Sequence, residues 1–538
     1  MPAAEINPVL PGCHPDPSIC RVGEDYYLVT SSFAYFPGLP VHRSRDLVRW
    51  ELVGHVLAEP AHVDLDGLDV SDGVWAPTIR HHDGLFHVVY TVAEDRRGRG
   101  TFVTTAADPA GPWSAPVDLH AEGIDPSLFF DADGRAWFTA ARDALSPDAT
   151  GPGEIYLREF DHRALRLVGP THVLWHGAVT GAWVEAPHLY RRGDDYHLLA
   201  AEGGTGRDHA VTAAVASSPT GPYATDPRSP LLTHRHLGAL APVRNVGHAD
   251  LVDTPAGDTW AVVLGVRTVA GVHTLGRETF LVPVAWEPAG PVFAPGVGAV
   301  TGLGGHDGPA GGPAGGPAGG PEGGPEGGPE GGPEGDVAAD WVGVRGAVPH
   351  RWEGGDLSLA PSPDDLASRG RPAFLGRRQD RHAFAFSALV PAPASAEGHT
   401  ALVAFQSQDR FVAHSVRSEA GGVVVETVLR AGGADTALAR RPGAGRQRLG
   451  IRSDGHHYAF GTLSDTGAFD AHATLDAREL SSEAADSFVG VLLGVAHHGP
   501  AGAPWVRVAD VTYTAAGRDV PVTGAAAPNS AERRGSAR

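Results

Sequence analysis

The chain has 538 residues, a formal net charge of −21 and 20% charged residues, and this length allows two to four domains. The negative charge argues against nucleic acids and anionic membranes as partners, and the sequence lacks the run of about 18 apolar residues that a membrane span needs. Residues 1–11 contain neither the basic nor the apolar segment of a secretory signal, so we expect a cytoplasmic protein. In that compartment the two cysteines, Cys13 and Cys20, are expected to be free thiols.

A turn followed by an aromatic-rich apolar run occurs five times in residues 1–300. Successive copies lie 51 to 64 residues apart, measured between their central aromatics, which are Tyr26, Phe86, Trp137, Tyr196 and Trp260. A turn and then a β-rich run is the pattern of a β-hairpin. Five such units at a nearly constant period predict an all-β domain over residues 1–301, a five-bladed β-propeller in which each blade is a small antiparallel sheet.

Three acidic residues stand beside prolines at a similar position within this repeat. Asp16 lies between two prolines, Asp125 precedes one, and Glu185 is followed by one two residues later. Each precedes a copy of the repeat by about ten residues, in blades one, three and four, and the equivalent places in blades two and five hold Trp75 and His248. Taken singly, an acid beside a proline is ordinary turn chemistry. Because equivalent positions of successive blades converge on one axis, we predict that the three carboxylates line one central depression.

The second half of the chain has a different pattern. Residues 302–340 are rich in proline and glycine and predict a solvated linker. From residue 341 to 520, short alternating strands without the fivefold period predict a second all-β domain, a β-sandwich of the concanavalin-like jelly-roll type. Residues 521–538 are small and polar and are predicted to be a disordered tail.

Carboxylates that share one cavity are what hydrolysis of a glycosidic bond needs. A protonated acid gives its proton to the leaving oxygen, and an ionised base activates water on the opposite face of the sugar. Glu185 has apolar neighbours, which raise the pKa of a carboxyl, so it suits the acid. Asp16, held by its prolines, suits the base, and the charge of Asp125 keeps Glu185 protonated. The alternative is a calcium site made of the three acids and His248, although the sequence lacks a dense local ligand loop.

The sequence also resembles glycoside hydrolase family 43, the family of β-xylosidases and α-L-arabinofuranosidases. The resemblance includes the His-Pro-Asp-Pro-Ser run around Asp16 and extends through the predicted propeller in order. The matching stretches are residues 7–20, 36–50, 75–78, 123–131, 185–190, 201–206, 247–252 and 276–280. Residues 371–379 are similar to the C-terminal sandwich of the β-xylosidase branch.

The resemblance implies an inverting mechanism in which Asp16 is the general base, Glu185 the general acid and Asp125 the residue that tunes the acid. It also implies a sugar pocket whose apolar walls are formed by Phe33 and Trp75. In this pocket His248 would lie on the propeller axis, Arg277 would bind sugar hydroxyls, and Phe488 would reach over the mouth from the sandwich. Core aromatics, a structural histidine and a surface ion pair are the alternative interpretations of these five. No cofactor is required on this hypothesis, with a calcium ion on the propeller axis near His248 as the alternative.

The resemblance leaves the substrate open. We expect an exo-acting enzyme that releases xylose from the non-reducing ends of short β-1,4-xylo-oligosaccharides, with an α-L-arabinofuranosidase as the alternative. A non-catalytic carbohydrate-binding propeller is an interpretation from another class; it predicts the loss of at least one of the three acids, and all three are present. The linker is far longer than the usual family connection, which leaves open whether the sandwich docks and places Phe488 at the pocket. The sequence also leaves open whether the protein forms a homo-oligomer.

Overall fold

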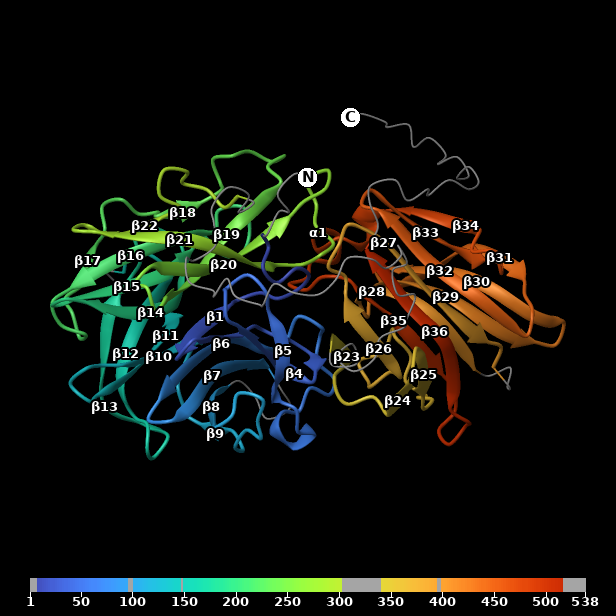
Figure 1. Cartoon of the computed structure of the whole chain (residues 1–538), viewed down its shortest axis with the longest axis horizontal. Helices are drawn as coiled ribbons and strands as arrows, with labels where there is room; N and C mark the ends of the chain where they lie inside the picture. The colour runs from blue at the N-terminus through green and yellow to red at the C-terminus, as the bar shows by residue number, and fades with distance from the viewer. Residues whose placement is uncertain (1–6, 95–99, 147–148, 302–339, 394–397, 516–538) are drawn as a thin grey trace, which may run out of the picture.

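The computed structural model describes residues 7–94, 100–146, 149–301, 340–393 and 398–515. In these ranges nearly every element is a β-strand, and the strands form two domains that lie side by side (Figure 1). The helical elements are short; they include α1 (Ser482–Ala485) and the 3-10 turns η1 (Pro60–His62) and η3 (Ala477–Leu480). No helix in the described ranges is long and apolar enough to cross a membrane.

Five antiparallel sheets form the blades, so the predicted propeller is confirmed. Blade one contains β1 (Ser18–Val22), β2 (Asp25–Val29), β4 (Gly38–Ser44) and β5 (Glu51–Leu57). Blade two contains β6 (Gly73–His82), β7 (Leu85–Glu94), β8 (Gly100–Ala106) and β9 (Val117–Asp118). Blade three contains β10 (Ile124–Phe130), β11 (Ala136–Asp143), β12 (Gly153–Asp161) and β13 (Arg166–Trp175). Blade four contains β14 (Val184–Arg192), β15 (Asp195–Glu202), β16 (Ala210–Ala216), β17 (Ala224–Thr225) and β18 (Leu232–Thr233), and blade five contains β19 (Val243–Asp253), β20 (Thr259–Arg267), β21 (Glu278–Glu287) and β22 (Gly290–Phe293).

The aromatic run of the repeat forms the second strand of each blade. The five aromatics are at most 7% exposed and lie on β2, β7, β11, β15 and β20. Tyr26 of blade one and Trp260 of blade five share one hydrophobic cluster, and the segment before β1 adds a bridge between Leu10 and Thr279 on β21. The repeat therefore supplies the core between blades, and the start of the chain joins the first blade to the last.

The first strand of each blade begins near a residue with left-handed backbone geometry. The angle φ lies between 40° and 55° for Asp16, Ala76, Asp125, Ala186 and His248. In blades two to five the strand register shifts at this place, and in four blades the next residue is a proline, which has no N–H to offer the ladder. Left-handed geometry is unfavourable outside glycine and concentrates at functional sites. Each blade therefore has a strained residue near the start of its first strand, and these five residues mark one end of the propeller axis.

Further along the axis, buried polar side chains join the inner strands. Arg80 on β6 donates hydrogen bonds of 2.8 and 3.0 Å to the Asp250 carboxylate on β19. Asp250 also accepts hydrogen bonds from Ser18 at 2.6 Å and Tyr190 at 2.5 Å, and the Nδ1 atom of His188 lies 3.0 Å from the Arg80 guanidinium. Burial alone would raise the pKa of Asp250, but Arg80 and His188 outweigh burial and lower it. This network ties together blades one, two, four and five.

The second domain consists of two stacked sheets around one core, so the predicted sandwich is confirmed. One sheet contains, in spatial order, β3 (Tyr35–Phe36), β23 (Trp341–Val344), β26 (Phe374–Arg378), β35 (Leu492–His498), β28 (His399–Ser407), β29 (Arg410–Glu419), β30 (Gly422–Ala431) and β31 (Ala434–Pro442). The other contains β24 (His350–Glu353), β25 (Asp356–Leu359), β36 (Val506–Ala515), β27 (Ala383–Pro391), β32 (Arg446–Asp454), β33 (His457–Leu463) and β34 (Phe469–Asp476).

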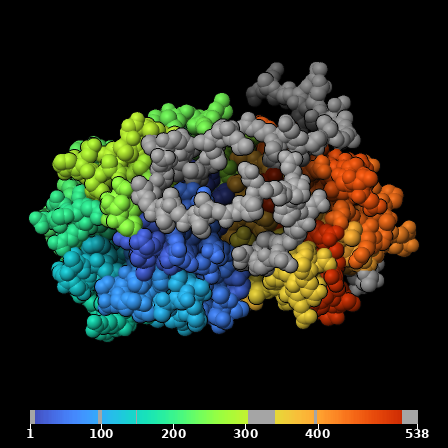
Figure 2. All heavy atoms as spheres, in the orientation of Figure 1, coloured from blue at the N-terminus to red at the C-terminus, as the bar shows by residue number. Residues whose placement is uncertain are grey.

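The sandwich is docked on the propeller despite the length of the linker. Strand β3 belongs to the propeller segment but pairs with β23, Tyr35 opposite Val344. The buried side chain of Arg345 donates a 2.6 Å hydrogen bond to the Leu68 carbonyl, and its backbone N–H donates one of 2.7 Å to Ala34. Side chains of both domains share a hydrophobic cluster, and the space-filling view shows the blue first blade meeting the yellow start of the sandwich (Figure 2). The interface is therefore continuous with the domain cores.

The predicted domain limits can be compared with the end of the propeller and the start of the sandwich. The last propeller strand, β22, ends at Phe293, and β23 begins the sandwich segment at Trp341. The predicted linker, apart from Asp340, and the predicted tail at 521–538 lie outside the described residues. Because β3 completes the larger sandwich sheet, a division at residue 301 assigns one strand of that sheet to the propeller segment.

Candidate active site

At the entry to the inner strands, the propeller and the sandwich enclose a cavity of about 110 Å³. All eight predicted site residues line it, together with three that were not predicted. The lining residues are Asp16, Phe33, Trp75, Ala76, Ile124, Asp125, Glu185, Thr205, His248, Arg277 and Phe488. Ten of these come from the propeller, and Phe488 comes from the segment between α1 and β35. The blade repeat and the docking of the sandwich thus bring residues 16 to 488 of the sequence to one place.

Asp16 is a carboxylate held at both oxygens. Its Oδ1 atom accepts a 2.8 Å hydrogen bond from Arg277, and its Oδ2 atom accepts one of 2.6 Å from the Ser31 hydroxyl. Ser31 in turn accepts a 2.7 Å hydrogen bond from the Ala76 N–H. Burial alone would raise the pKa of Asp16, but Arg277, His248 and Ser31 outweigh burial and the pKa lies below its ordinary value. Asp16 is therefore ionised at neutral pH and fixed in direction.

Asp125 and Glu185 behave as a pair. Burial and then the charge of Glu185 raise the pKa of Asp125 well above its ordinary value, while burial and the charge of Asp16 raise the pKa of Glu185 to about 7. Two buried carboxyls that repel each other retain a shared proton. The Ala186 N–H donates a 3.1 Å hydrogen bond to Asp125 Oδ2, which acts against this rise but does not outweigh burial and the charge of Glu185. Beside the ionised Asp16, the site thus keeps a proton donor at neutral pH.

Aromatic rings and a guanidinium form the rest of the wall. The Trp75 ring meets Phe33 and Phe488 edge-on, with centroids 6.5 and 5.9 Å apart, and its Nε1 atom donates a 2.9 Å hydrogen bond to the Ser71 carbonyl. The Arg277 guanidinium lies 5.5 Å from the Phe33 centroid and 5.6 Å from that of Phe488. Within the described part of the chain, Arg277 Nε is buried without a hydrogen-bond partner. The hydrogen-bonding capacity of this N–H is therefore unused in the structure.

His248 lies on the same wall, and its surroundings do not suit a calcium ion. Its Nδ1 atom is 3.8 Å from Asp16 Oδ1, and burial lowers its pKa, so the imidazole is neutral. Calcium takes six to eight oxygen ligands, whereas here the Asp16 oxygens are occupied by Arg277 and Ser31 and the nearby guanidinium repels a cation.

Three polar residues that shape the site were missed in the sequence. Ser31 orients the base, and Thr205 lines the cavity from the glycine-rich loop after β15. His209 donates through Nδ1 to the Asn245 carbonyl at 3.0 Å, and its ring fills the space beside Gly247, where a Cβ would come within 2.5 Å of it. A serine at a strand end and an isolated histidine carry no local signal. The glycine-rich run at 203–206 is the one feature that points to this loop.

Glu185 does not occupy the backbone position of the other two acids. Asp16 and Asp125 are themselves the left-handed residues of their blades, whereas in blade four that residue is Ala186 and Glu185 precedes it. Glu185 is therefore in register with Trp75, which precedes Ala76 in blade two. The acids were predicted to share one position in the repeat, and Glu185 is offset from that position by one residue. As a result, Asp16 has left-handed backbone geometry and Glu185 does not.

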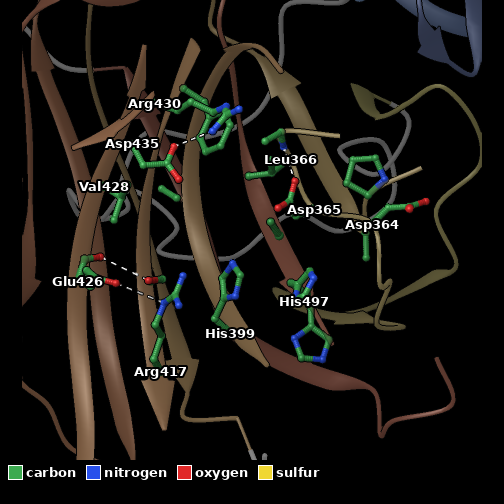
Figure 3. A pocket seen from close by; sticks show the side chains of 18 of the residues that line it. Asp364, Asp365, Leu366, His399, Arg417, Glu426, Val428, Arg430, Asp435 and His497 are labelled. Atoms are coloured by element: carbon green, nitrogen blue, oxygen red, sulfur yellow. Dashed lines mark hydrogen bonds and ion pairs between the residues drawn. The ribbon is translucent and has the colours of Figure 1, made fainter. Parts of the chain in front are cut away.

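A larger cavity, of about 410 Å³, lies in the sandwich (Figure 3). Four of its charged side chains are paired, Arg417 with Glu426 at 3.4 Å and Arg430 with Asp435 at 2.9 Å, across strands β29 to β31. The carboxylates of Asp364 and Asp365 accept hydrogen bonds from backbone N–H groups, which favour their ionised forms. A carboxylate neutralised by a guanidinium does not retain a proton and cannot act as an acid. The smaller cavity on the propeller axis, with its unequal carboxyls, is therefore the candidate active site.

A propeller that gathers an ionised carboxylate and a proton-retaining carboxyl pair in one pocket has the machinery of a glycoside hydrolase. The family model for glycosyl hydrolases family 43 matches residues 6–292, and the model for the β-xylosidase C-terminal concanavalin A-like domain matches residues 334–514. The chain belongs to glycosyl hydrolase family 43. The predicted family and enzyme class are confirmed.

Several named proteins are similar to this chain over most of its length. A xylosidase/arabinosidase of Butyrivibrio fibrisolvens is 40% identical over 416 residues, which cover 75% of this chain and 78% of that protein. A non-reducing end α-L-arabinofuranosidase of Bacteroides ovatus is 34% identical over 500 residues, covering 91% and 90%. The crystal structure of xylan β-1,4-xylosidase from Bacillus halodurans superposes with a TM-score of 0.82 at 31% identity, covering 94% of this chain and 98% of that one. Proteins similar to this chain are thus named for both sugars.

Proposed function

We propose that this chain is an inverting exo-glycosidase that releases xylose from the non-reducing ends of short β-1,4-xylo-oligosaccharides. The observation that carries the proposal is the contrast in protonation within one cavity. Asp16 has a lowered pKa, whereas Asp125 and Glu185 together retain a proton. An inverting glycosidase needs an ionised base and a protonated acid at the same time.

In the proposed reaction, Asp16 takes a proton from a water molecule whose oxygen attacks the anomeric carbon. Glu185 gives its proton to the glycosidic oxygen as the bond between that oxygen and the anomeric carbon breaks. The free sugar leaves with inverted configuration, Asp16 is protonated, Glu185 is ionised, and exchange with solvent restores both. Arg277 keeps the base ionised through its 2.8 Å hydrogen bond, and Asp125 shares the proton of the acid.

The dimensions of the cavity support exo action. A volume of about 110 Å³ is well below the several hundred Å³ of pockets that enclose drug-sized ligands, so it suits a single sugar unit. The rings of Phe33, Trp75 and Phe488 offer apolar surface for the C–H face of that unit. Phe488 is 44% exposed and suits the mouth, where the remaining sugar units leave the pocket.

An α-L-arabinofuranosidase is the second candidate, because a relative with that name is similar over nine-tenths of both chains. Xylose is favoured here because the sandwich matches a domain named for β-xylosidases. The test compares kcat/KM on p-nitrophenyl β-D-xylopyranoside and p-nitrophenyl α-L-arabinofuranoside and measures xylose release from xylobiose. A higher kcat/KM on the xyloside than on the arabinofuranoside, together with cleavage of xylobiose, supports the proposal. Preference for the arabinofuranoside without xylobiose cleavage supports the alternative, and no cleavage of any of the three rejects both.

The stereochemistry is tested separately. Proton NMR of the first turnovers on p-nitrophenyl β-D-xylopyranoside, which releases only one xylose, is expected to show α-xylose before mutarotation, because attack from the face opposite the β-linkage inverts the anomeric carbon. Initial appearance of β-xylose would mean retention and would reject Asp16 as a base acting through water.

A further inference from the structure

Two hairpin turns of neighbouring blades bring two imidazoles and a carboxylate together at a distance from the catalytic cavity. His82 and Asp83 stand at the turn between β6 and β7 of blade two, and His162 stands in the turn between β12 and β13 of blade three. His82 Nε2 lies 3.6 Å from Asp83 Oδ1, and His162 Nε2 lies 3.7 Å from Asp83 Oδ2. The three ligand atoms all lie within 4.8 Å of one another, and no other group of three such ligands occurs among the described residues.

We propose that His82, Asp83 and His162 form a binding site for a divalent transition metal ion, with Zn²⁺ as the preferred occupant. Two imidazole nitrogens and one carboxylate oxygen, with water as the fourth ligand, are a donor set that Zn²⁺ accepts in tetrahedral geometry. Imidazole ligands do not suit Mg²⁺ or Ca²⁺, which prefer oxygen. Ligands at about 2.0–2.1 Å from a tetrahedral zinc are roughly 3.3 Å apart, which is close to the two nitrogen–oxygen separations.

The contacts of these side chains favour a metal over a direct hydrogen bond. Both separations are longer than a hydrogen bond, and in the described part of the chain His162 Nε2 is buried without a hydrogen-bond partner. A buried nitrogen without a partner is unfavourable, and a metal ion between the imidazoles and the carboxylate would satisfy it. The His82 and Asp83 side chains are 30% and 61% exposed, so they can close the remaining distance and a solvent ligand can enter.

The site is also held in shape by its surroundings. The His82 ring stacks on Phe130, with centroids 4.3 Å apart and planes 13° from parallel, and meets the His162 ring edge-on at 5.0 Å. Asp83 has a φ of 50°, which the hairpin turn fixes. His82 is seven residues along β6 from Trp75, roughly 20 Å at the usual rise of a strand. A metal here would clamp blade two to blade three and would leave the catalytic cavity untouched.

The test titrates Zn²⁺, without added substrate, into the full chain after treatment with a chelator. Calorimetry of the unmodified chain is expected to show one tight site, with Zn²⁺ raising the melting temperature. H82A and H162A are each expected to weaken this binding at least tenfold and to abolish the rise. D83N removes the charged ligand while asparagine tolerates the left-handed turn, so it should weaken binding comparably. His120, an exposed imidazole 3.2 Å from the Asp118 carboxylate, provides the control, and H120A should bind like the unmodified chain.

A second readout separates loss of ligands from loss of fold. Co²⁺ in place of Zn²⁺ should give visible absorption bands of tetrahedral strength in the unmodified chain and in H120A, and these bands should be lost in H82A and H162A. Unchanged hydrolysis of an aryl xyloside, or an unchanged circular dichroism spectrum should that activity be absent, shows that the variants are folded. Equal zinc affinity in the unmodified chain and in an H82A/H162A double variant, or the absence of saturable binding, would overturn the proposal.

Discussion

Arg277 donates a 2.8 Å hydrogen bond to Asp16, and this single ion pair joins the last blade of the propeller to the first at the centre of the cavity. The Arg277 guanidinium also lies 5.6 Å from the ring of Phe488, which the sandwich contributes. Arg277 therefore links the electrostatics of the proposed base to the wall that closes the pocket. Its replacement tests both relationships.

R277A is expected to shift the acidic limb of the pH profile of kcat/KM to higher pH. The guanidinium is the strongest influence that lowers the pKa of Asp16, so its loss leaves burial to raise that pKa and Asp16 becomes protonated at a higher pH. Activity at pH 6 should fall at least roughly tenfold, within the range for a disturbed base. R277K keeps a positive charge and should show a smaller shift. An acidic limb at the same pH in R277A would contradict the role given to Asp16.

E185Q should show that the acid matters most when the leaving group is poor. Glutamine cannot donate the proton, so cleavage of xylobiose should fall by roughly 10² to 10⁴. The loss should be much smaller on p-nitrophenyl xyloside, because that leaving group departs without a proton. D16N is the matched comparison: the base is needed for either substrate, so the two losses should be similar. Equal losses in E185Q on both substrates would remove Glu185 from the role of acid.

D125N should move the basic limb of the pH profile to lower pH. The basic limb reports deprotonation of Glu185, whose pKa is raised to about 7, so activity falls above about that pH. Asparagine removes the carboxylate that shares the proton with Glu185, so Glu185 should lose its proton at a lower pH. The measurement is kcat/KM from pH 5 to 9 for D125N and the unmodified chain. A basic limb that stays in place would show that Asp125 does not tune the acid.

The propeller was predictable because every blade contains one copy of the sequence repeat. A turn and an aromatic strand recur with Tyr26, Phe86 and Trp137, and core packing leaves that pattern visible in the sequence. The acids of the site were predictable because prolines mark the strained entries to the strands. Ser31 and His209 were not, because each acts through a contact with a residue distant in sequence, and no local pattern marks such a contact. The one-residue offset of Glu185 was also hidden, since only the strand register reveals it.

F488A tests whether the sandwich takes part in substrate binding. Phe488 lines the cavity, is 44% exposed and contacts Trp75, so its removal opens the mouth with little loss of core packing. We expect KM for xylobiose to rise roughly tenfold, with kcat and the melting temperature nearly unchanged. Trp505, an aromatic of the same domain with 45% exposure, lies outside the cavity lining, and W505A should leave KM unaltered. An unchanged KM in F488A would show that the sandwich only covers the propeller.

R80M should destabilise the propeller more than any loss of a surface ion pair. Arg80 neutralises Asp250 at 2.8 Å in the buried axial network, and removing one partner of a buried pair costs about 3–5 kcal/mol. Because the folded-state pKa of Asp250 is lowered, its stabilisation is present above its ordinary value of 3.8 and is lost as the pH falls below it. The difference in urea midpoint between R80M and the unmodified chain should therefore be largest at neutral pH and shrink below pH 4. R49M, which removes an exposed pair with Asp46, should change the midpoint little at any pH, and a pH-independent difference for R80M would contradict the assignment.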